Sequence, residues 1–235
     1  MSGLLEVVAL SVADAERAEA GGADRVAVFG ELDDGGLSPT PKLVAEIRRA
    51  TSIQVRAMVR LRDGYSTDGG EAVRIRGLMA SYAEAGADGM ILGFLNGLGE
   101  VDVALIEELI DDGTWPWTFH RAVDATLDLD RAWLALRRLP RLDQVLTAGS
   151  ARDVENGLTE LVARAKADPW AQRVIMAGGG LRAEHVPWLT RAGITAFQVG
   201  SAARPGGSYE AGVDEELVRS WAGLISQESR HRPSR

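Results

Sequence analysis

The chain contains no cysteine among its 235 residues. The absence of thiols excludes disulfides, zinc ribbons, thiolate copper sites and cysteine nucleophiles, and it fits a reducing compartment. Lysine is almost absent too, because only Lys42 and Lys166 accompany the arginines. Both fall in predicted helices, so neither supplies the strand-end amine that a Schiff-base aldolase needs.

The sequence also lacks the runs that mark nucleic-acid and membrane proteins. Its net charge is −8 and it has no dense basic block, which argues against a nucleic-acid partner. No apolar run approaches the length of a membrane span. The first residues lack the basic and apolar regions of a signal peptide. We therefore expect a cytoplasmic protein with no membrane partner.

Short apolar runs rich in β-branched residues alternate with longer amphipathic stretches. The runs predict strands at 4–10, 24–29, 54–60, 88–92, 116–120, 144–147, 173–177 and 196–199. The stretches predict helices at 13–20, 41–50, 71–85, 101–111, 130–139, 151–167, 183–192 and 214–225. This alternation predicts an α/β fold, a single-domain (β/α)₈ TIM-type barrel over 1–226 with a polar, flexible tail over 227–235. A doubly wound sheet is the alternative, but residues 7–12 lack the glycines of a dinucleotide fingerprint.

Several helix ends carry local signals. Thr40 before Pro41 resembles an N-cap followed by proline at the first helical position, and Ser150 with Asp153 resembles a capping box. Glycine closes three of the predicted helices, at 21–22, 86 and 193. It suits the left-handed conformation that turns the chain back toward the sheet.

His120 ends the fifth predicted strand, with Arg121 and Asp124 close behind. In a barrel of this kind the strand C-termini and the loops after them build the site. We therefore consider His120 as an acid/base and Asp124 as its orienting partner or a metal-binding carboxylate. A polar strand end satisfied by loop backbone is the alternative. Side-chain alternation places Thr118 and His120 on one face, so Arg121 is expected to brace the outside.

Arginines and an acidic residue occur in or at the ends of other predicted strands. Arg60 and Arg62 follow the third strand, two residues apart, and can together bind a carboxylate or phosphate. Structural salt bridges to Glu6 or other rim carboxylates are the equal alternative. Glu6 lies within the first strand, where a buried ion pair with an arginine is expected; a catalytic role is the second interpretation.

Glycines follow the seventh and eighth strands. Gly178, Gly179 and Gly180 come after the seventh, and Gly200 with Ser201 after the eighth, where barrel enzymes frequently bind phosphate. A tight turn is the alternative explanation. Thr147, at the end of the sixth strand, belongs to the same rim. The main functional hypothesis is an enzyme that binds a small anionic metabolite here, a lyase, isomerase or hydrolase; a non-catalytic binding protein is another.

Five motifs, in order along the first 200 residues, resemble the CutC family. They are Gly21-Gly22-Ala23-Asp24-Arg25, Gly35-Gly36-Leu37-Ser38-Pro39-Thr40, Thr118-Phe119-His120-Arg121-Ala122-Val123-Asp124, Leu146-Thr147-Ala148-Gly149 and Ile175-Met176-Ala177-Gly178-Gly179-Gly180. The resemblance implies a (β/α)₈ barrel that forms a homo-oligomer, a dimer or larger, and a label of cytoplasmic copper homeostasis. Arg25, in the first motif, joins the expected ligand-binding residues.

The sequence departs from the family pattern at four positions. The family usually has glutamate, often cysteine, proline and histidine where this chain has Ala27, Phe29, Leu61 and Gln198. These losses suggest a divergent paralogue with a changed ligand. Copper follows only from the family label, because Cu(I) prefers thiolate and thioether ligands. A divalent ion beside Glu6 or Asp124 stays open, so the metal and cofactor are unspecified; copper or metal handling is a further functional alternative.

Overall fold

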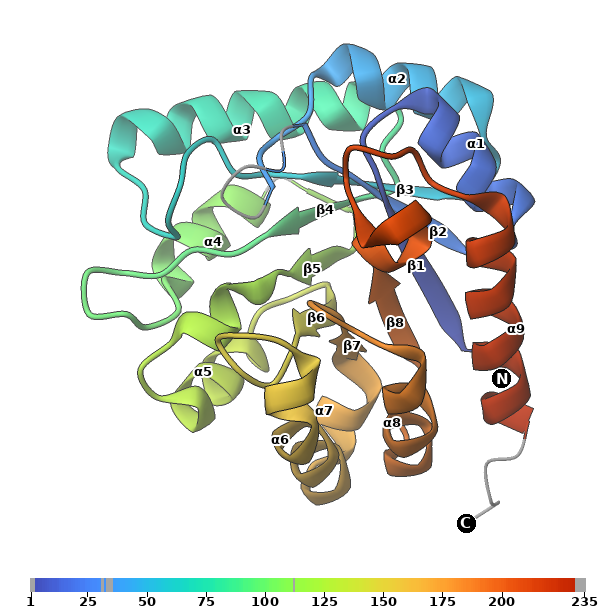
Figure 1. Cartoon of the computed structure of the whole chain (residues 1–235). Helices are drawn as coiled ribbons and strands as arrows, with labels where there is room; N and C mark the ends of the chain where they lie inside the picture. Colours follow the sequence, from blue (N-terminus) through green and yellow to red (C-terminus); the bar gives the residue numbers. More distant parts are fainter. Residues whose placement is uncertain (1–2, 31, 33–35, 112, 231–235) are drawn as a thin grey trace.

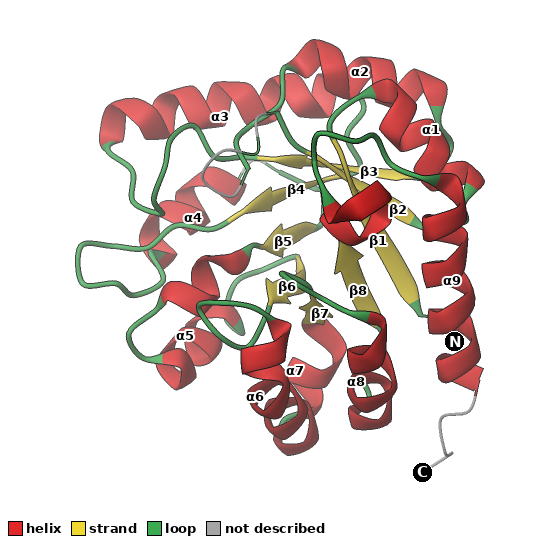
Figure 2. Ribbon diagram, in the orientation of Figure 1, coloured by secondary structure: helices red, strands yellow, loops and turns green. Residues whose placement is uncertain are grey.

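Eight parallel strands close into a barrel that helices surround (Figures 1 and 2). The structure is a computed structural model that describes residues 3–30, 32, 36–111 and 113–230. The strands are β1 (Leu4–Ala9), β2 (Arg25–Val28), β3 (Gln54–Met58), β4 (Gly89–Leu92), β5 (Trp117–Phe119), β6 (Leu142–Thr147), β7 (Ile175–Ala177) and β8 (Ala196–Val199). They are hydrogen-bonded in chain order, which confirms the predicted (β/α)₈ barrel.

Helices follow the strands along the chain, and the described residues also form four short 3₁₀ turns. The α-helices are α1 (Val12–Ala20), α2 (Pro41–Ala50), α3 (Gly69–Glu84), α4 (Val103–Ile110), α5 (Leu129–Leu136), α6 (Val154–Ala167), α7 (Pro169–Val174), α8 (Val186–Ala192) and α9 (Glu215–Arg230). The 3₁₀ turns are η2 (Arg121–Ala125), η3 (Ala183–His185), η4 (Ser201–Ala203) and η5 (Pro205–Gly207). Within the described ranges, no helix combines the length and apolarity that crossing a membrane requires.

Several element boundaries differ from the sequence predictions, and three of them concern the seventh strand, α6 and α9. Residues 173–174, assigned to the seventh strand, end the short helix α7, which begins with Pro169 after the N-cap Asp168. Helix α6 begins at Val154, with Asp153 as its N-cap, and Ser150 bonds the turn before it. Helix α9 continues to Arg230, so 227–230 are helical rather than a tail; 231–235 lie outside the described residues.

The glycine turns have the predicted conformation. Gly22, Gly86 and Gly193 have φ of 92°, 91° and 98°, in the left-handed region. Each precedes the return to a strand, so three of the eight units turn by the same means. Thr40 caps α2 by accepting from the N–H of Leu43, with Pro41 at the first helical position.

Ring closure joins the two ends of the chain. Strand β1 pairs with β8 in parallel, with Leu4 opposite Ala196. A buried ion pair reinforces the seam, because Arg204 after β8 donates to Asp14 of α1 at 2.8 Å. Arg204 also donates to the carbonyl of Val8. The seam therefore fixes the loop between β8 and α9 over the barrel mouth.

Candidate functional site

A cavity of about 240 Å³ opens at the C-terminal mouth of the barrel. Strand ends and loops from seven of the eight units, all except that of β4, converge on it. Its lining comprises Val8, Phe29, Leu32, Met58, Arg60, Tyr65, His120, Arg121, Leu146, Gly179, Gly180, Leu181, Gln198, Val199, Gly200, Ser201, Ala202 and Tyr209. None of these described residues is acidic, and two are arginines. The cavity therefore favours a ligand with negative charge.

His120 lines this cavity and is 3% exposed. It directly follows β5, and its backbone N–H continues the ladder to Leu92. Its Nδ1 accepts a hydrogen bond from the backbone N–H of Ala122 at 3.1 Å. The neutral ring therefore carries its proton on Nε2, and Nε2 is buried without a hydrogen-bond partner among the described residues. Buried donors are normally hydrogen-bonded, so this N–H is available to an acceptor atom of a ligand.

Burial, and then the charge of Arg60, lower the pKa of His120 to about 3. The unfolded chain binds a proton near pH 6.5 that the folded protein does not take up until about pH 3. The contribution of His120 to the free energy of unfolding is therefore fully present above pH 6.5. It is lost as the pH falls from 6.5 toward 3. We expect His120→Asn to remove this dependence. Between pH 7 and pH 5, wild type should lose about 2 kcal/mol more than the variant, measured by urea unfolding; parallel losses would contradict the burial of a neutral imidazole.

Arg121 also lines the cavity, so the prediction that it braces the outside is wrong. Strand β5 ends at Phe119 and the 3₁₀ turn η2 starts at Arg121, so strand alternation no longer applies there. Its Nε donates to Asp124 at 2.9 Å, and its Nη2 donates to loop carbonyls at 150–152. The guanidinium lies against Gly179, where a Cβ would come within 2.7 Å of Nη1.

The two arginines after β3 separate. Arg60 lines the cavity and is 5% exposed; it donates to the carbonyl of Gly64 and to Asp63, and its guanidinium lies over the ring of Tyr65. Arg62 lies outside the cavity lining and pairs with Glu71 at 2.9 Å. The structure thus brings only one of the pair to the cavity, and Arg62 takes the alternative role of a salt bridge.

Asp124 orients Arg121 rather than His120. One of its oxygens accepts from the Thr147 hydroxyl at 2.6 Å, and the other from Arg121 and from the N–H of Ala148. The bond that orients His120 comes instead from Ala122. Neither Asp124 nor Thr147 lines the cavity. Together they tie the loop after β5 to the end of β6, which fixes the direction of Arg121.

Glu6 and Arg25 form a buried ion pair inside the barrel at 2.5 Å, as expected for Glu6. The other oxygen of Glu6 accepts from Gln198 at 2.7 Å, and Arg25 also contacts the sulfur of Met176. Neither member of the pair lines the cavity, although Gln198 does. Glu6 and Arg25 therefore lie below the site in the interior of the barrel, and their expected direct roles in catalysis and ligand binding stay predictions.

Some residues of the glycine-rich loops after β7 and β8 line the cavity and one does not. Gly179, Gly180, Gly200 and Ser201 line the cavity, whereas Gly178 packs outside the lining between β6 and β8. The φ values of Gly179 and Gly180 are 88° and 72°, a conformation that side-chain-bearing residues rarely adopt. The glycines of these loops present backbone to the cavity.

The apolar residues of the lining were not identified from the sequence, and neither were two tyrosines and a glycine that shape the site. Tyr65 and Tyr209 flank the cavity from loops, the first with its ring centroid 5.4 Å from that of His120. Tyr209 sits on Gly200, where a Cβ would lie 1.9 Å from its hydroxyl. Gly93 makes room for the imidazole, since a Cβ there would lie 2.7 Å from Nδ1 of His120. The only signal in the sequence was glycine itself, at the positions where these rings pack against backbone.

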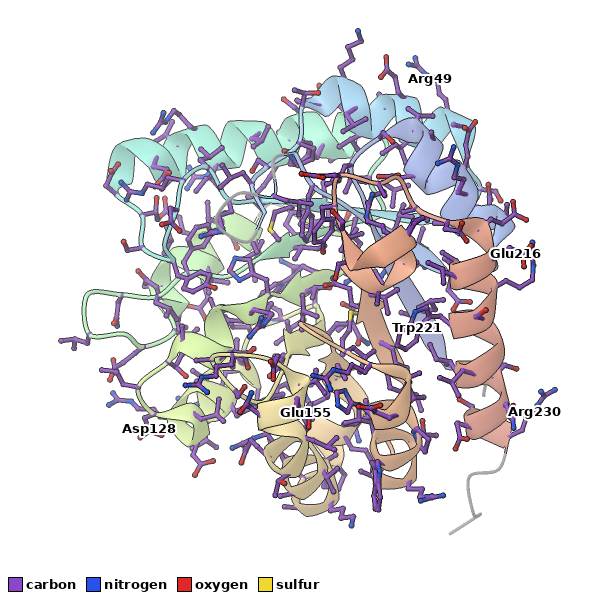
Figure 3. All side chains as sticks on the ribbon, in the orientation of Figure 1. Arg49, Asp128, Glu155, Glu216, Trp221 and Arg230 are labelled. Atoms are coloured by element: carbon purple, nitrogen blue, oxygen red, sulfur yellow. The ribbon has the colours of Figure 1, made fainter. Side chains whose placement is uncertain are left out.

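One group of potential metal ligands occurs among the described residues, and none of its members lines the cavity. Glu155, Glu184 and His185 bring ligand atoms within 4.8 Å of one another; Figure 3 labels Glu155 near the start of α6. Both nitrogens of His185 are already used, Nδ1 by the N–H of Arg182 and Nε2 by Glu155. Arg182 also pairs with both glutamates. Ion pairs therefore explain this cluster.

The amino-acid sequence matches a known protein family. The model of the CutC family matches residues 3–203. The chain belongs to the CutC family. CutC family members from Klebsiella pneumoniae (strain 342) and Xylella fastidiosa (strain Temecula1) are each 32% identical to it. The matches cover 93% and 95% of this chain and 92% and 89% of those proteins.

Solved structures agree on the fold. A Streptococcus agalactiae structure named CutC and assigned to copper homeostasis superposes with a TM-score of 0.74 at 24% identity, covering 84% of this chain and 98% of that one. The homocysteine methyltransferase MmuM from Escherichia coli follows with 0.65 at 14% identity, covering 94% and 96%. At these identities the likeness shows the shared barrel. In this CutC family member, Ala27 and Phe29 fall in an apolar cluster at the cavity, and Gln198 pairs with Glu6.

Proposed function

We propose that this CutC family protein binds a small anionic ligand at the C-terminal mouth of its barrel. The buried Nε2–H of His120, which no described residue accepts, carries the proposal. Arg60 and Arg121 line the same cavity, while the aspartates that pair with them, Asp63 and Asp124, lie outside its lining. A ligand oxygen on Nε2 would satisfy the donor, and a charged acceptor makes such a bond stronger than a neutral one.

Catalysis by a lyase, isomerase or hydrolase mechanism stays a prediction on this basis. A neutral imidazole that donates from Nε2 can polarise a carbonyl or carboxylate oxygen as charge develops on it. The bond from Ala122 occupies Nδ1, so a base role would require that contact to break. The geometry therefore favours His120 as a hydrogen-bond donor over a general base. A non-catalytic binding protein and the expected cytoplasmic homo-oligomer are equally compatible with this site.

Copper handling is the function that the name of the Streptococcus agalactiae relative suggests, and the donor set does not fit it. The chain has no cysteine. Among the described residues of the cavity lining, Met58 and His120 alone carry a thioether or an imidazole. Cu(I) prefers thiolates and thioethers. Met58 offers a single thioether, and on His120, Nδ1 already accepts a hydrogen bond while Nε2 carries the proton. These two side chains make a poor copper site.

Paired substitutions of His120 test the anion proposal. His120→Asn keeps an acceptor for the N–H of Ala122 but is too short to place a donor at Nε2, whereas His120→Gln places an amide N–H near Nε2. We expect benzoate, acetate or inorganic phosphate to bind the wild-type protein. The Asn variant should bind the same anion about 10- to 100-fold more weakly than wild type, the range for one hydrogen bond to a charged group. The Gln variant should recover part of the affinity. Titration followed by ¹H–¹⁵N NMR gives the dissociation constants.

His185→Asn is the matched control, because His185 is equally buried and its Nδ1 also accepts a backbone N–H, from Arg182. It lies outside the cavity lining, so its substitution should leave anion affinity unchanged. Equal loss in both Asn variants would assign the effect to general destabilisation. Binding that survives His120→Asn at full strength would exclude His120 as the donor.

A further inference from the structure

One wall of the cavity has no polar side chains. The end of β1 contributes Val8, the residue after β2 is Phe29, and the end of β3 contributes Met58. These three pack with Ala27 and Ile91 as an apolar cluster that is separate from the main core, and none is more than 5% exposed. Leu146 and Leu181 extend the apolar lining toward the opposite side. A hydroxyl placed against this wall would lose its hydrogen bonds to water without replacement.

The hydrogen-bond donors gather on the facing wall. Because the strands run in order around a closed ring, β6 lies opposite β2, and the loops after its neighbours β5 and β7 lie across the mouth from β2. Within the described part of the chain, nothing accepts from the N–H groups of Gly179 and Gly180 or from Nη1 of Arg121. Arg121 lies directly against Gly179, so these donors adjoin one another. On the β3 side, Arg60 already donates to Asp63 and to the carbonyls of Gly36 and Gly64. The donors without an acceptor among the described residues therefore lie at one end of the cavity.

The size of the cavity limits the ligand further. Its volume of about 240 Å³ falls below the roughly 300–1,000 Å³ of pockets for drug-sized molecules. That space holds a carboxylate on a body of several carbons. A sugar phosphate would direct hydroxyls to Val8, Phe29 and Met58, where nothing can pair with them.

We infer that the ligand is a small monocarboxylic acid with an apolar body, its carboxylate toward His120 and Arg121 and its hydrocarbon against Val8, Phe29 and Met58. This inference rests on the proposed anion site and adds the chemical class of what fills it. Apolar contact then contributes to affinity in proportion to the area that leaves water.

A homologous series of acids tests the apolar wall. Acetate, propionate, butyrate, valerate and benzoate are titrated into the intact protein and followed by ¹H–¹⁵N NMR, with inorganic phosphate and glycolate as polar anions. We expect affinity to rise about three- to fourfold for each added methylene until the cavity is full. Glycolate, whose hydroxyl meets the apolar wall, should bind no better than acetate. Phosphate should bind more weakly than butyrate.

Two substitutions of one residue locate the effect. Met58→Gln is close in size but polar, and it should lower butyrate and benzoate affinity about tenfold more than acetate affinity. Met58→Leu keeps the wall apolar and should retain the preference for butyrate over acetate. A flat series, with acetate binding through His120, would overturn the apolar body but leave the anion site standing. If affinity rises along the series and neither Met58→Gln nor His120→Asn changes it, the acids bind elsewhere and the inference is overturned. No His120-dependent binding by any anion would overturn both proposals.

Discussion

Gly157→Ala is expected to destabilise the barrel by about 3 kcal/mol or more, at the upper end of overpacking substitutions. Gly157 lies in α6 where the helix presses on the loop after β6. A Cβ there would meet the carbonyl oxygen of Ala148 at 2.0 Å, the carbonyl carbon of Gly149 at 2.5 Å and the amide nitrogen of Ser150 at 2.7 Å. All three are backbone atoms of a short turn, so none can rotate aside. Urea unfolding, monitored by tryptophan fluorescence, measures the loss.

The site should respond to the same substitution. The loop that Gly157 touches supplies the carbonyls at 150–152 that hold Nη2 of Arg121. Displacing the loop should therefore weaken anion binding even where the variant remains folded.

Gly77→Ala is the matched control. Gly77 also lies inside a helix, α3, but a Cβ added there would meet nothing within 4 Å. Alanine has the higher helix propensity, so this variant should gain roughly 0.5–1 kcal/mol. Similar effects of the two substitutions would contradict the close approach of α6 to the loop.

Glu6→Gln should cost about 3–5 kcal/mol, the range for removing one partner of a buried ion pair. The substitution keeps the shape of the side chain, yet it leaves the charge of Arg25 without its carboxylate in the barrel interior. Arg25 also contacts the sulfur of Met176, but a thioether accepts hydrogen bonds weakly and cannot replace the carboxylate. Urea unfolding again gives the free energy.

A double variant separates charge from packing. Glu6→Gln combined with Arg25→Met removes both charges and should recover at least half of the lost stability, because the pair as a whole contributes little net free energy. The double variant should also bind anions as wild type does, since neither residue lines the cavity. A single variant as stable as wild type would mean that another group compensates Arg25.

The fold could be predicted because its signals are local. Parallel strands covered on both faces form short apolar runs, and their alternation with amphipathic stretches gives the order of elements. The errors fell where short elements replaced the expected ones. Six residues from Pro169 form α7, too few for helical periodicity to show, and β5 stopped one residue before the predicted end at His120.

The site could be predicted only in part, because a cavity is assembled from distant loops. His120, Gly179 and Ser201 were placed correctly on the rim since each closely follows a strand. Tyr65 and Tyr209 stand several residues beyond β3 and β8, and no periodicity gives the direction of a loop. The orientation of Arg121 depends on carbonyls about 30 positions away, which adjacent residues do not reveal.

The seam between β1 and β8 has a consequence for synthesis of the protein. Asp14 and Arg204, which close it, are 190 positions apart. Domains made from the N-terminus begin to fold as the chain emerges, but here β1 keeps one edge unpaired until β8, at Ala196–Val199, has been made. During that interval the exposed edge can pair with another nascent chain. The late synthesis of β8 therefore sets how long the edge of β1 stays exposed. Crowded polysomes should favour aggregation of nascent chains until β8 leaves the ribosome.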